Sequence, residues 1–123
     1  MIVGLGIDFV NVNRMRHWPE VDGIIERFFH KNEVESSMSR GSSSILSLAA
    51  RFAAKEAFGK ALGTGLKGIK LTDIEVWNNY NGKPDIILHE TALEAFMDLG
   101  GKSIHLSLSH EEEAAVAVVI IEG

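Results

Sequence analysis

A run of ten residues near the middle of the chain, RFAAKEAFGK at positions 51–60, combines a helical composition with four charges. It has three alanines and two phenylalanines but no proline or β-branched residue, which favours a helix. Over residues 45–62 apolar side chains would surround that helix almost completely, as is typical of a buried helix. A charge buried without a partner costs several kcal/mol. The charged residues must therefore reach a cleft, a metal, an anion or one another: Arg51, Lys55, Glu56 and Lys60.

These charges suit two kinds of ligand, because a carboxylate favours a hard divalent cation whereas Lys and Arg favour phosphate. A second carboxylate, Asp8, ends the apolar run MIVGLGIDFV, where its side chain should meet the junction of a sheet and the helix. Asp8 and Glu56 together would suit Mg²⁺, which commonly takes one or two carboxylates plus waters and substrate phosphates. Two simpler interpretations stay open at this point. Glu56 and Lys60 could form a surface i, i+4 pair worth about 0.3–0.5 kcal/mol, and Asp8 could lie at a helix N-terminus.

The elements that must position these residues follow from hydrophobic periodicity and turn signals. We predict helices at 14–18, 21–38, 45–62 and 91–100, with a polar loop at 40–44 and a helix stop at Gly63 and Gly65. Strands are predicted at 1–10, 71–77, 85–89, 104–110 and 114–122. Asn81-Gly82 is a hairpin signal, residues 111–113 form a turn, and the last strand, apolar on both faces, should be central. This order predicts an α+β fold with a mostly antiparallel sheet packed on a long central helix.

Length and composition narrow the class of protein. The 123 residues suit one domain, residues 1–123. A formal net charge of −5 argues against a general role on nucleic acid or membrane surfaces. The chain has no cysteine, and its start is neither a signal peptide nor a membrane span. The five histidines show no zinc-ligand spacing such as H-E-x-x-H. We therefore expect a cytoplasmic protein.

Four stretches resemble, in order and spacing, the bacterial holo-acyl-carrier-protein synthases, the small homotrimeric branch of the 4′-phosphopantetheinyl transferases. They are GLGIDFVNVNRM, RFAAKEAFGKALGTG, IEVWNNYNGKPDI and SLSHEEEAAVAVVIIE, and they span nearly the whole chain. The most specific signals are G-x-D near the start and F-x-x-K-E-A-x-x-K about 45 residues later. The resemblance implies the 4′-phosphopantetheinyl transferase fold, assembled as a homotrimer with active sites between subunits.

The resemblance also implies an activity. The family transfers phosphopantetheine from coenzyme A to a serine of apo-acyl carrier protein, leaving adenosine 3′,5′-bisphosphate, and supports fatty acid biosynthesis. Asp8 and Glu56 would hold Mg²⁺, with Mn²⁺ as an alternative, and Lys60 would contact the phosphate and assist the leaving group. These three residues would be catalytic. The general base for the serine hydroxyl would be either Glu56 or a water held by Asp8 and the metal.

Further positions match the family's substrate contacts. The resemblance implies that coenzyme A is bound by Arg51, Lys55, Lys60, Gly63, Thr64, Gly65, Asn81, Gly82, Lys83, Pro84 and His110. Because carrier proteins are acidic and this chain is acidic too, docking would need a local basic face. The resemblance implies such a face at Arg14, Arg16 and Arg27. The three glutamates at 111–113 add negative charge beside the expected nucleotide contacts.

Two other functions compete with the enzyme. A non-catalytic trimer could bind coenzyme A or a related nucleotide as a sensor, but a mere binder would not need the pair of carboxylates together with Lys60. A structural oligomerisation domain would leave the charged helix unexplained. The presence of Asp8, Glu56 and Lys60 favours the enzyme.

Overall fold

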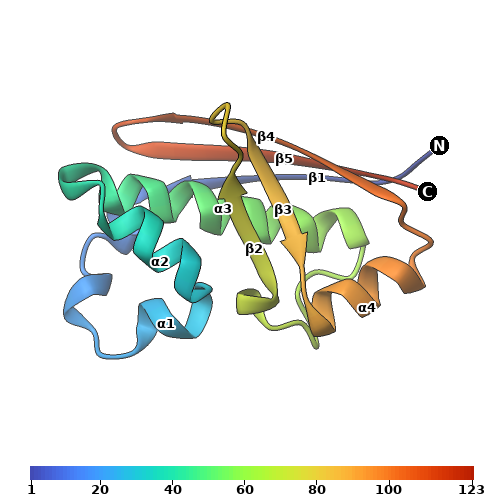
Figure 1. Ribbon diagram of the computed structural model, residues 1–123, viewed down its shortest axis with the longest axis horizontal. Helices are drawn as coiled ribbons and strands as arrows, with labels where there is room; N and C mark the ends of the chain where they lie inside the picture. Colours follow the sequence, from blue (N-terminus) through green and yellow to red (C-terminus); the bar gives the residue numbers. More distant parts are fainter.

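The computed structural model describes all 123 residues and has the predicted α+β architecture (Figure 1). Its strands are β1 (Ile2–Asn11), β2 (Ile74–Asn78), β3 (Pro84–Leu88), β4 (Ser103–Glu111) and β5 (Ala114–Glu122). Its α-helices are α1 (Ile24–Phe28), α2 (Lys31–Met38), α3 (Ser44–Leu62) and α4 (Glu90–Asp98). No helix has both the length and the apolar character needed to cross a membrane.

The larger sheet is antiparallel and has the strand order β1-β5-β4, with β5 in the centre as predicted. Alternate residues of β5 are fully buried beneath α3, which runs along the sheet (Figure 1): Ala115, Ala117, Val119 and Ile121. The contact is unusually close on the β1 side. A Cβ atom added at Gly6 would lie 1.9 Å from the carbonyl oxygen of Ala57 in α3, so only glycine fits.

The second sheet is the hairpin β2–β3, which packs with α2 against the remaining surface of α3. Its turn contains the predicted Asn81-Gly82 pair, and Gly82 has a φ of +81°, a left-handed conformation that glycine adopts without strain. The long helix α3 is therefore central, as predicted, with the larger sheet and the hairpin both in contact with it (Figure 1).

The segment between β1 and α3 differs from the prediction. The helix expected at 14–18 is two single 3₁₀ turns, Val12–Met15 and Trp18–Glu20. The helix expected at 21–38 is split into α1 and α2, because Phe29 and His30 are extended. Phe29 is buried against the aromatic rings of Trp18 and Phe52, so tertiary packing outweighs helical propensity at this break. The strand expected to start at residue 71 starts at Ile74, after a 3₁₀ turn.

The outer face of the larger sheet is apolar and uncovered along β1 and β5, whereas the outward residues of β4 are polar. The odd-numbered residues of β1 point away from α3 and are 39–64% exposed: Val3, Leu5, Ile7 and Phe9. Three of them pair with half-buried apolar residues of β5, as Leu5 does with Ile120 and Phe9 with Val116. A continuous apolar surface of this kind is a feature of interfaces.

Candidate functional site

Asp8 and Lys60 meet where β1 crosses the C-terminal half of α3. Even-numbered residues of β1 face the helix, so Asp8 lies one strand repeat beyond Gly6 on the same face. The Lys60 Nζ donates to Asp8 Oδ1 and to the Ile7 carbonyl oxygen, both at 3.0 Å. The Lys60 side chain is 55% exposed, so its ammonium group is also open to solvent. Lys60 is thus paired with Asp8 and not with Glu56, which removes the interpretation of a simple i, i+4 pair.

Glu56, one helical turn before Lys60, completes the cluster. Partial burial raises the pKa of Glu56, the negative charge of Asp8 raises it further, and the positive charges of Lys60 and Arg14 oppose the rise. The charges of Asp8, Lys60 and Arg14 therefore all act on Glu56, and the structure brings Asp8, Glu56 and Lys60 together as the sequence predicted. Arg14 was predicted to belong to a docking surface, and its place beside this cluster was not predicted.

The pair of carboxylates fits a hard divalent cation. Asp8 comes from a strand fixed by its ladder to β5, and Glu56 from a buried helix, so neither backbone is free to relax away from the other. The negative charge of Asp8 disfavours the ionised form of Glu56, so a cation between the two carboxylates would be favourable, and Mg²⁺ needs only one or two carboxylates. Asp8 and Glu56 are the residues that would hold such a metal.

A cleft of about 300 Å³ lies between the hairpin, α3 and the end of β4. Four residues predicted to bind coenzyme A line it: Arg51, Gly82, Pro84 and His110. Three polar lining residues were not predicted: Arg40, Ser47 and Asn78. Arg51 is held in place by three bonds, from Nη1 to Ser47 Oγ at 2.7 Å, from Nη2 to Ser36 Oγ and from Nε to the Val76 carbonyl oxygen. Burial lowers the pKa of Arg51, but a guanidinium group stays charged. The cleft therefore offers a fixed cation to an anionic ligand.

The other predicted coenzyme A contacts lie elsewhere. Asn81 and Lys83 are exposed in the hairpin turn, where their backbone N–H groups donate to the side chain of Asn79. Gly63 and Gly65 end α3 in left-handed conformations, and Thr64 lines a separate hollow beside α4. Arg51 and Lys60 are nine residues apart on one helix, or roughly 14 Å along its axis. One chain therefore presents the predicted contacts as two separate groups.

Lys55 lies in the protein core. Both the Lys55 and Glu33 side chains are fully buried, and Lys55 Nζ donates to Glu33 Oε1 at 2.6 Å. It also donates to the carbonyl oxygens of Leu71, at 2.8 Å, and Ile74. Burial lowers the pKa of Lys55, and the charge of Glu33 counteracts part of that shift. All three ammonium protons thus have internal acceptors, and the structure places Lys55 in an ion pair that sequence reasoning missed.

The predicted docking arginines are all exposed but differ in their contacts. Arg14 lies close enough to Glu56 to influence its charge. Arg16 instead holds the turn after β4: Nε donates to Asn13 Oδ1 at 2.7 Å and Nη2 to the Glu112 carbonyl oxygen at 3.3 Å. The guanidinium of Arg27 lies over the ring of Phe28.

The predicted acidic turn is fastened to the loop that follows β1. Glu113 Oε2 accepts from Asn13 Nδ2 at 2.8 Å, and the Val12 N–H donates to the Glu113 carbonyl oxygen at 2.8 Å. The carboxylate of Glu113 is therefore directed at this loop. Of the three glutamates at 111–113, Glu113 thus has its charge engaged away from the expected nucleotide contacts.

Fold and site together define a small α+β protein with a carboxylate pair and a lysine at a strand–helix junction, and comparison with known proteins identifies its family. The model of the 4′-phosphopantetheinyl transferase superfamily matches residues 4–119. The chain belongs to this superfamily, which confirms the resemblance drawn from its motifs.

Several known proteins match this chain over all or nearly all of their length. The holo-[acyl-carrier-protein] synthase of Treponema denticola is 57% identical over 123 residues, all of both chains. The crystal structure of holo-[acyl-carrier-protein] synthase from Neisseria meningitidis superposes with a TM-score of 0.89 at 32% identity, again over all of both chains. The structure of the Bacillus anthracis holo-(acyl-carrier-protein) synthase, in complex with CoA (3′,5′-ADP), has a TM-score of 0.80 at 40% identity, covering 98% of this chain and 96% of the other.

Proposed function

We propose that this protein transfers 4′-phosphopantetheine from coenzyme A to a serine of apo-acyl carrier protein, in the cytoplasm and in support of fatty acid biosynthesis. The observation that carries the proposal is the cluster of Asp8, Glu56 and Lys60, found in a chain whose full-length relatives are holo-[acyl-carrier-protein] synthases. The products are holo-acyl carrier protein and adenosine 3′,5′-bisphosphate. A sensor that only binds coenzyme A would not require the carboxylate pair.

Asp8 and Glu56 hold Mg²⁺ in this proposal, with Mn²⁺ as an alternative. A cation held by these two residues would neutralise charge on the diphosphate of coenzyme A. The serine Oγ attacks the β-phosphorus, and the bond between that phosphorus and the oxygen bridging to the α-phosphate breaks. Lys60, which is exposed and held beside Asp8, stabilises the negative charge that develops on this oxygen. Glu56 would accept the serine proton, or a water would do so where Asp8 and a bound cation would hold it.

Coenzyme A contacts come from two subunits. Arg51, Gly82, Pro84 and His110 form one group at the cleft, and the end of α3 forms the other, with Lys60 and residues 63–65. Asn81 and Lys83, in the hairpin turn, extend the first group. The Arg51 guanidinium suits a phosphate of the nucleotide. Lys55 is omitted from this set because its ammonium group has no free proton to donate.

The uncovered sheet face supports the homotrimer. The exposed residues Val3, Leu5, Ile7 and Phe9 would be covered by neighbouring copies of the chain. A site made from two neighbouring subunits would also explain why one chain displays its predicted contacts as two separate groups. Light scattering of the purified protein tests the assembly.

Carrier-protein docking is proposed at Arg14 and Arg27, with Arg16 acting mainly through the turn that it holds. Arg14→Glu should weaken binding of the acidic carrier protein while coenzyme A binding persists. Lys102→Glu, which makes the same charge change at an exposed residue before β4, is the matched control. Equal losses of carrier and coenzyme A binding in Arg14→Glu would count against docking.

The decisive assay uses the protein with Mg²⁺, coenzyme A and apo-acyl carrier protein, and follows the mass of the carrier. Transfer adds one phosphopantetheine group, roughly 340 Da. Glu56→Gln should abolish this mass increase without changing the assembly, whereas Glu94→Gln, an exposed residue of α4, should not affect it. Coenzyme A binding without transfer by the wild-type protein would indicate a sensor. Full activity of Glu56→Gln would refute the metal assignment.

A further inference from the structure

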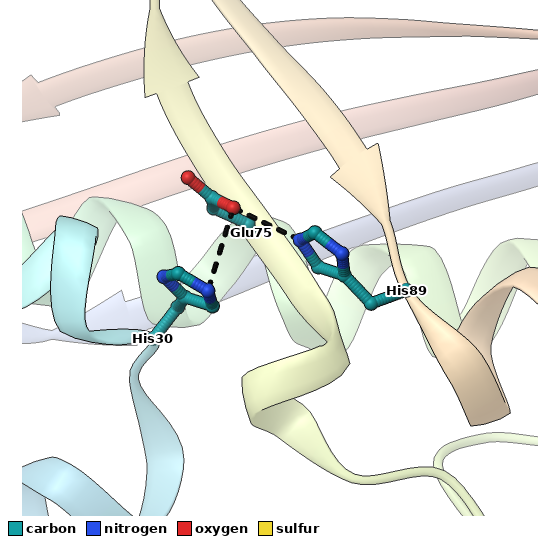
Figure 2. Close-up of side chains that lie close together, drawn as sticks. All are labelled: His30, Glu75 and His89. Atoms are coloured by element: carbon teal, nitrogen blue, oxygen red, sulfur yellow. Dashed lines mark hydrogen bonds and ion pairs between the residues drawn. The ribbon is translucent and has the colours of Figure 1, made fainter.

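Three potential metal ligands converge at the base of the hairpin, away from the proposed active site. His30 is the residue before α2, Glu75 lies in β2, and His89 follows β3 (Figure 2). One ligand atom from each residue lies within 4.8 Å of the others. None of these residues lines the cleft or takes part in the cluster at Asp8.

The distances suit a small divalent ion. His89 Nε2 lies 2.9 Å from Glu75 Oε1, and His30 Nε2 lies 3.8 Å from the same oxygen. Tetrahedral coordination at about 2.0–2.2 Å from the metal places neighbouring ligand atoms roughly 3.3 Å apart, between these two values. The imidazole rings are nearly parallel, at 14°, with centroids 5.4 Å apart, and both direct a nitrogen toward the carboxylate (Figure 2). Little movement is needed to coordinate one ion.

The carboxylate is already oriented for this task. Glu75 is 6% exposed, and its second oxygen, Oε2, accepts from Asn32 Nδ2 at 3.2 Å. This hydrogen bond turns Oε1 toward both histidines, as outer-shell partners do in metal sites. The side chains of His30 and His89 are 25% and 38% exposed, which leaves an open side for an ion to arrive and for water to complete the coordination.

His30 provides a specific signature of binding. Its Nδ1 accepts from the Asn32 backbone N–H at 3.1 Å, so the proton of the neutral ring is on Nε2. A metal at Nε2 requires that proton to move to Nδ1, and the hydrogen bond from Asn32 N–H is then lost. His30 is the N-cap residue of α2, and the Asn32 bond is one of two that cap this helix. The second, from the His30 N–H to Glu33 Oε1 at 2.9 Å, is unaffected. The Asn32 amide therefore reports directly on occupancy.

We propose that His30, Glu75 and His89 bind one divalent transition-metal ion of the Zn²⁺ type, with water in the remaining position. Two imidazoles and a carboxylate select such ions over Mg²⁺, which prefers an all-oxygen environment. The ion would connect the start of α2 to both ends of the hairpin whose turn lines the cleft. It would thus brace the hairpin and take no part in phosphoryl transfer.

Co²⁺ is a suitable probe because four-coordinate Co²⁺ absorbs strongly in the visible region. The full-length protein, in excess Mg²⁺ to occupy the carboxylate pair, should bind one equivalent of Co²⁺ that Zn²⁺ displaces. His89→Gln should abolish the absorption, and Asn32→Ala should weaken Co²⁺ binding by roughly tenfold. His105→Gln is the matched control, since His105 is an exposed histidine paired with a single glutamate, Glu122, and should bind as the wild type does.

Absence of Co²⁺ binding by the wild-type protein, or unchanged binding by His89→Gln, would overturn the proposal. Because His89 is partly exposed, its substitution should leave the fold intact, which circular dichroism verifies. A nuclear magnetic resonance titration with Zn²⁺ gives a second readout: the Asn32 amide resonance should shift with one equivalent. A shift confined to residues around Asp8 and Glu56 would instead place the ion at the carboxylate pair and refute this site.

Discussion

Replacing Lys55 by methionine should destabilise the protein far more than the same change at Lys60, five residues later on α3. Lys55 and Glu33 are fully buried, and three internal oxygens accept from the ammonium group. Lys55→Met leaves the Glu33 carboxylate buried without its cation, a change that costs about 3–5 kcal/mol in buried pairs. For a domain with a free energy of unfolding of about 5–15 kcal/mol, much of the stability would be lost.

Lys60→Met removes a pair whose lysine is 55% exposed. Exposed ion pairs contribute about 0–1 kcal/mol, so this variant should unfold close to the wild type. Thermal unfolding at matched protein concentration should show a midpoint lowered by roughly 10–20 °C for Lys55→Met and nearly unchanged for Lys60→Met. The effects on transfer should be reversed: Lys60→Met loses activity, and folded Lys55→Met retains it.

A double variant tests the physical reasoning. Glu33→Gln combined with Lys55→Met removes the orphaned charge, so it should be more stable than Lys55→Met alone. If Lys55→Met instead keeps wild-type stability and loses affinity for coenzyme A, the internal ion pair has been misread and Lys55 contacts the substrate.

Three further changes have defined outcomes. Glu56→Gln should raise the melting temperature of the metal-free protein at neutral pH, because partial burial and the charge of Asp8 disfavour the ionised Glu56; a lower melting temperature would contradict this. Gly6→Ala should cost more than about 3 kcal/mol in urea unfolding, since the new Cβ would lie 1.9 Å from a backbone oxygen; a wild-type midpoint would show that the strand can move away. Burial raises the pKa of Glu75, but hydrogen bonds from His89 and Asn32 outweigh it and the net pKa is lowered. The stability from Glu75 is therefore present above its unfolded pKa of about 4.3 and lost as pH falls through the folded value, so Glu75→Gln should flatten the acid side of a stability–pH curve.

Much of the fold could be predicted because its patterns are local. β5 is apolar on both faces and is central, β4 alternates and has one buried face, and Asn81-Gly82 forms the hairpin turn. The region from Val12 to Met38 could not be divided correctly, because aromatic packing around Trp18 and Phe52 decides where its short helices end.

The site shows the same limit. Motif spacing, together with charges on a helix that is apolar nearly all round, predicted that Asp8, Glu56 and Lys60 lie together, and the structure brings them together. The partner of Lys55 could not be predicted from the sequence, because Glu33 is 22 residues away in a different helix. His30, Glu75 and His89 lack any zinc-ligand spacing because each comes from a different element. Only the tertiary structure brings such residues together.

The four charges of α3 divide by helical geometry into two pairs with different tasks. Arg51 and Lys55 are four residues apart and share the face of the helix that meets α2 and the hairpin, where both have internal acceptors. Glu56 and Lys60, also four apart, share the face beside β1 and Asp8. Adjacent residues such as Lys55 and Glu56 differ by about 100° around the helix, so the helix can be anchored through Lys55 on one face while it presents Glu56 and Lys60 on the other. Arg51, on the anchored face, also lines the cleft. Substitutions at Lys55 should therefore alter mainly stability, and those at Glu56 or Lys60 mainly transfer.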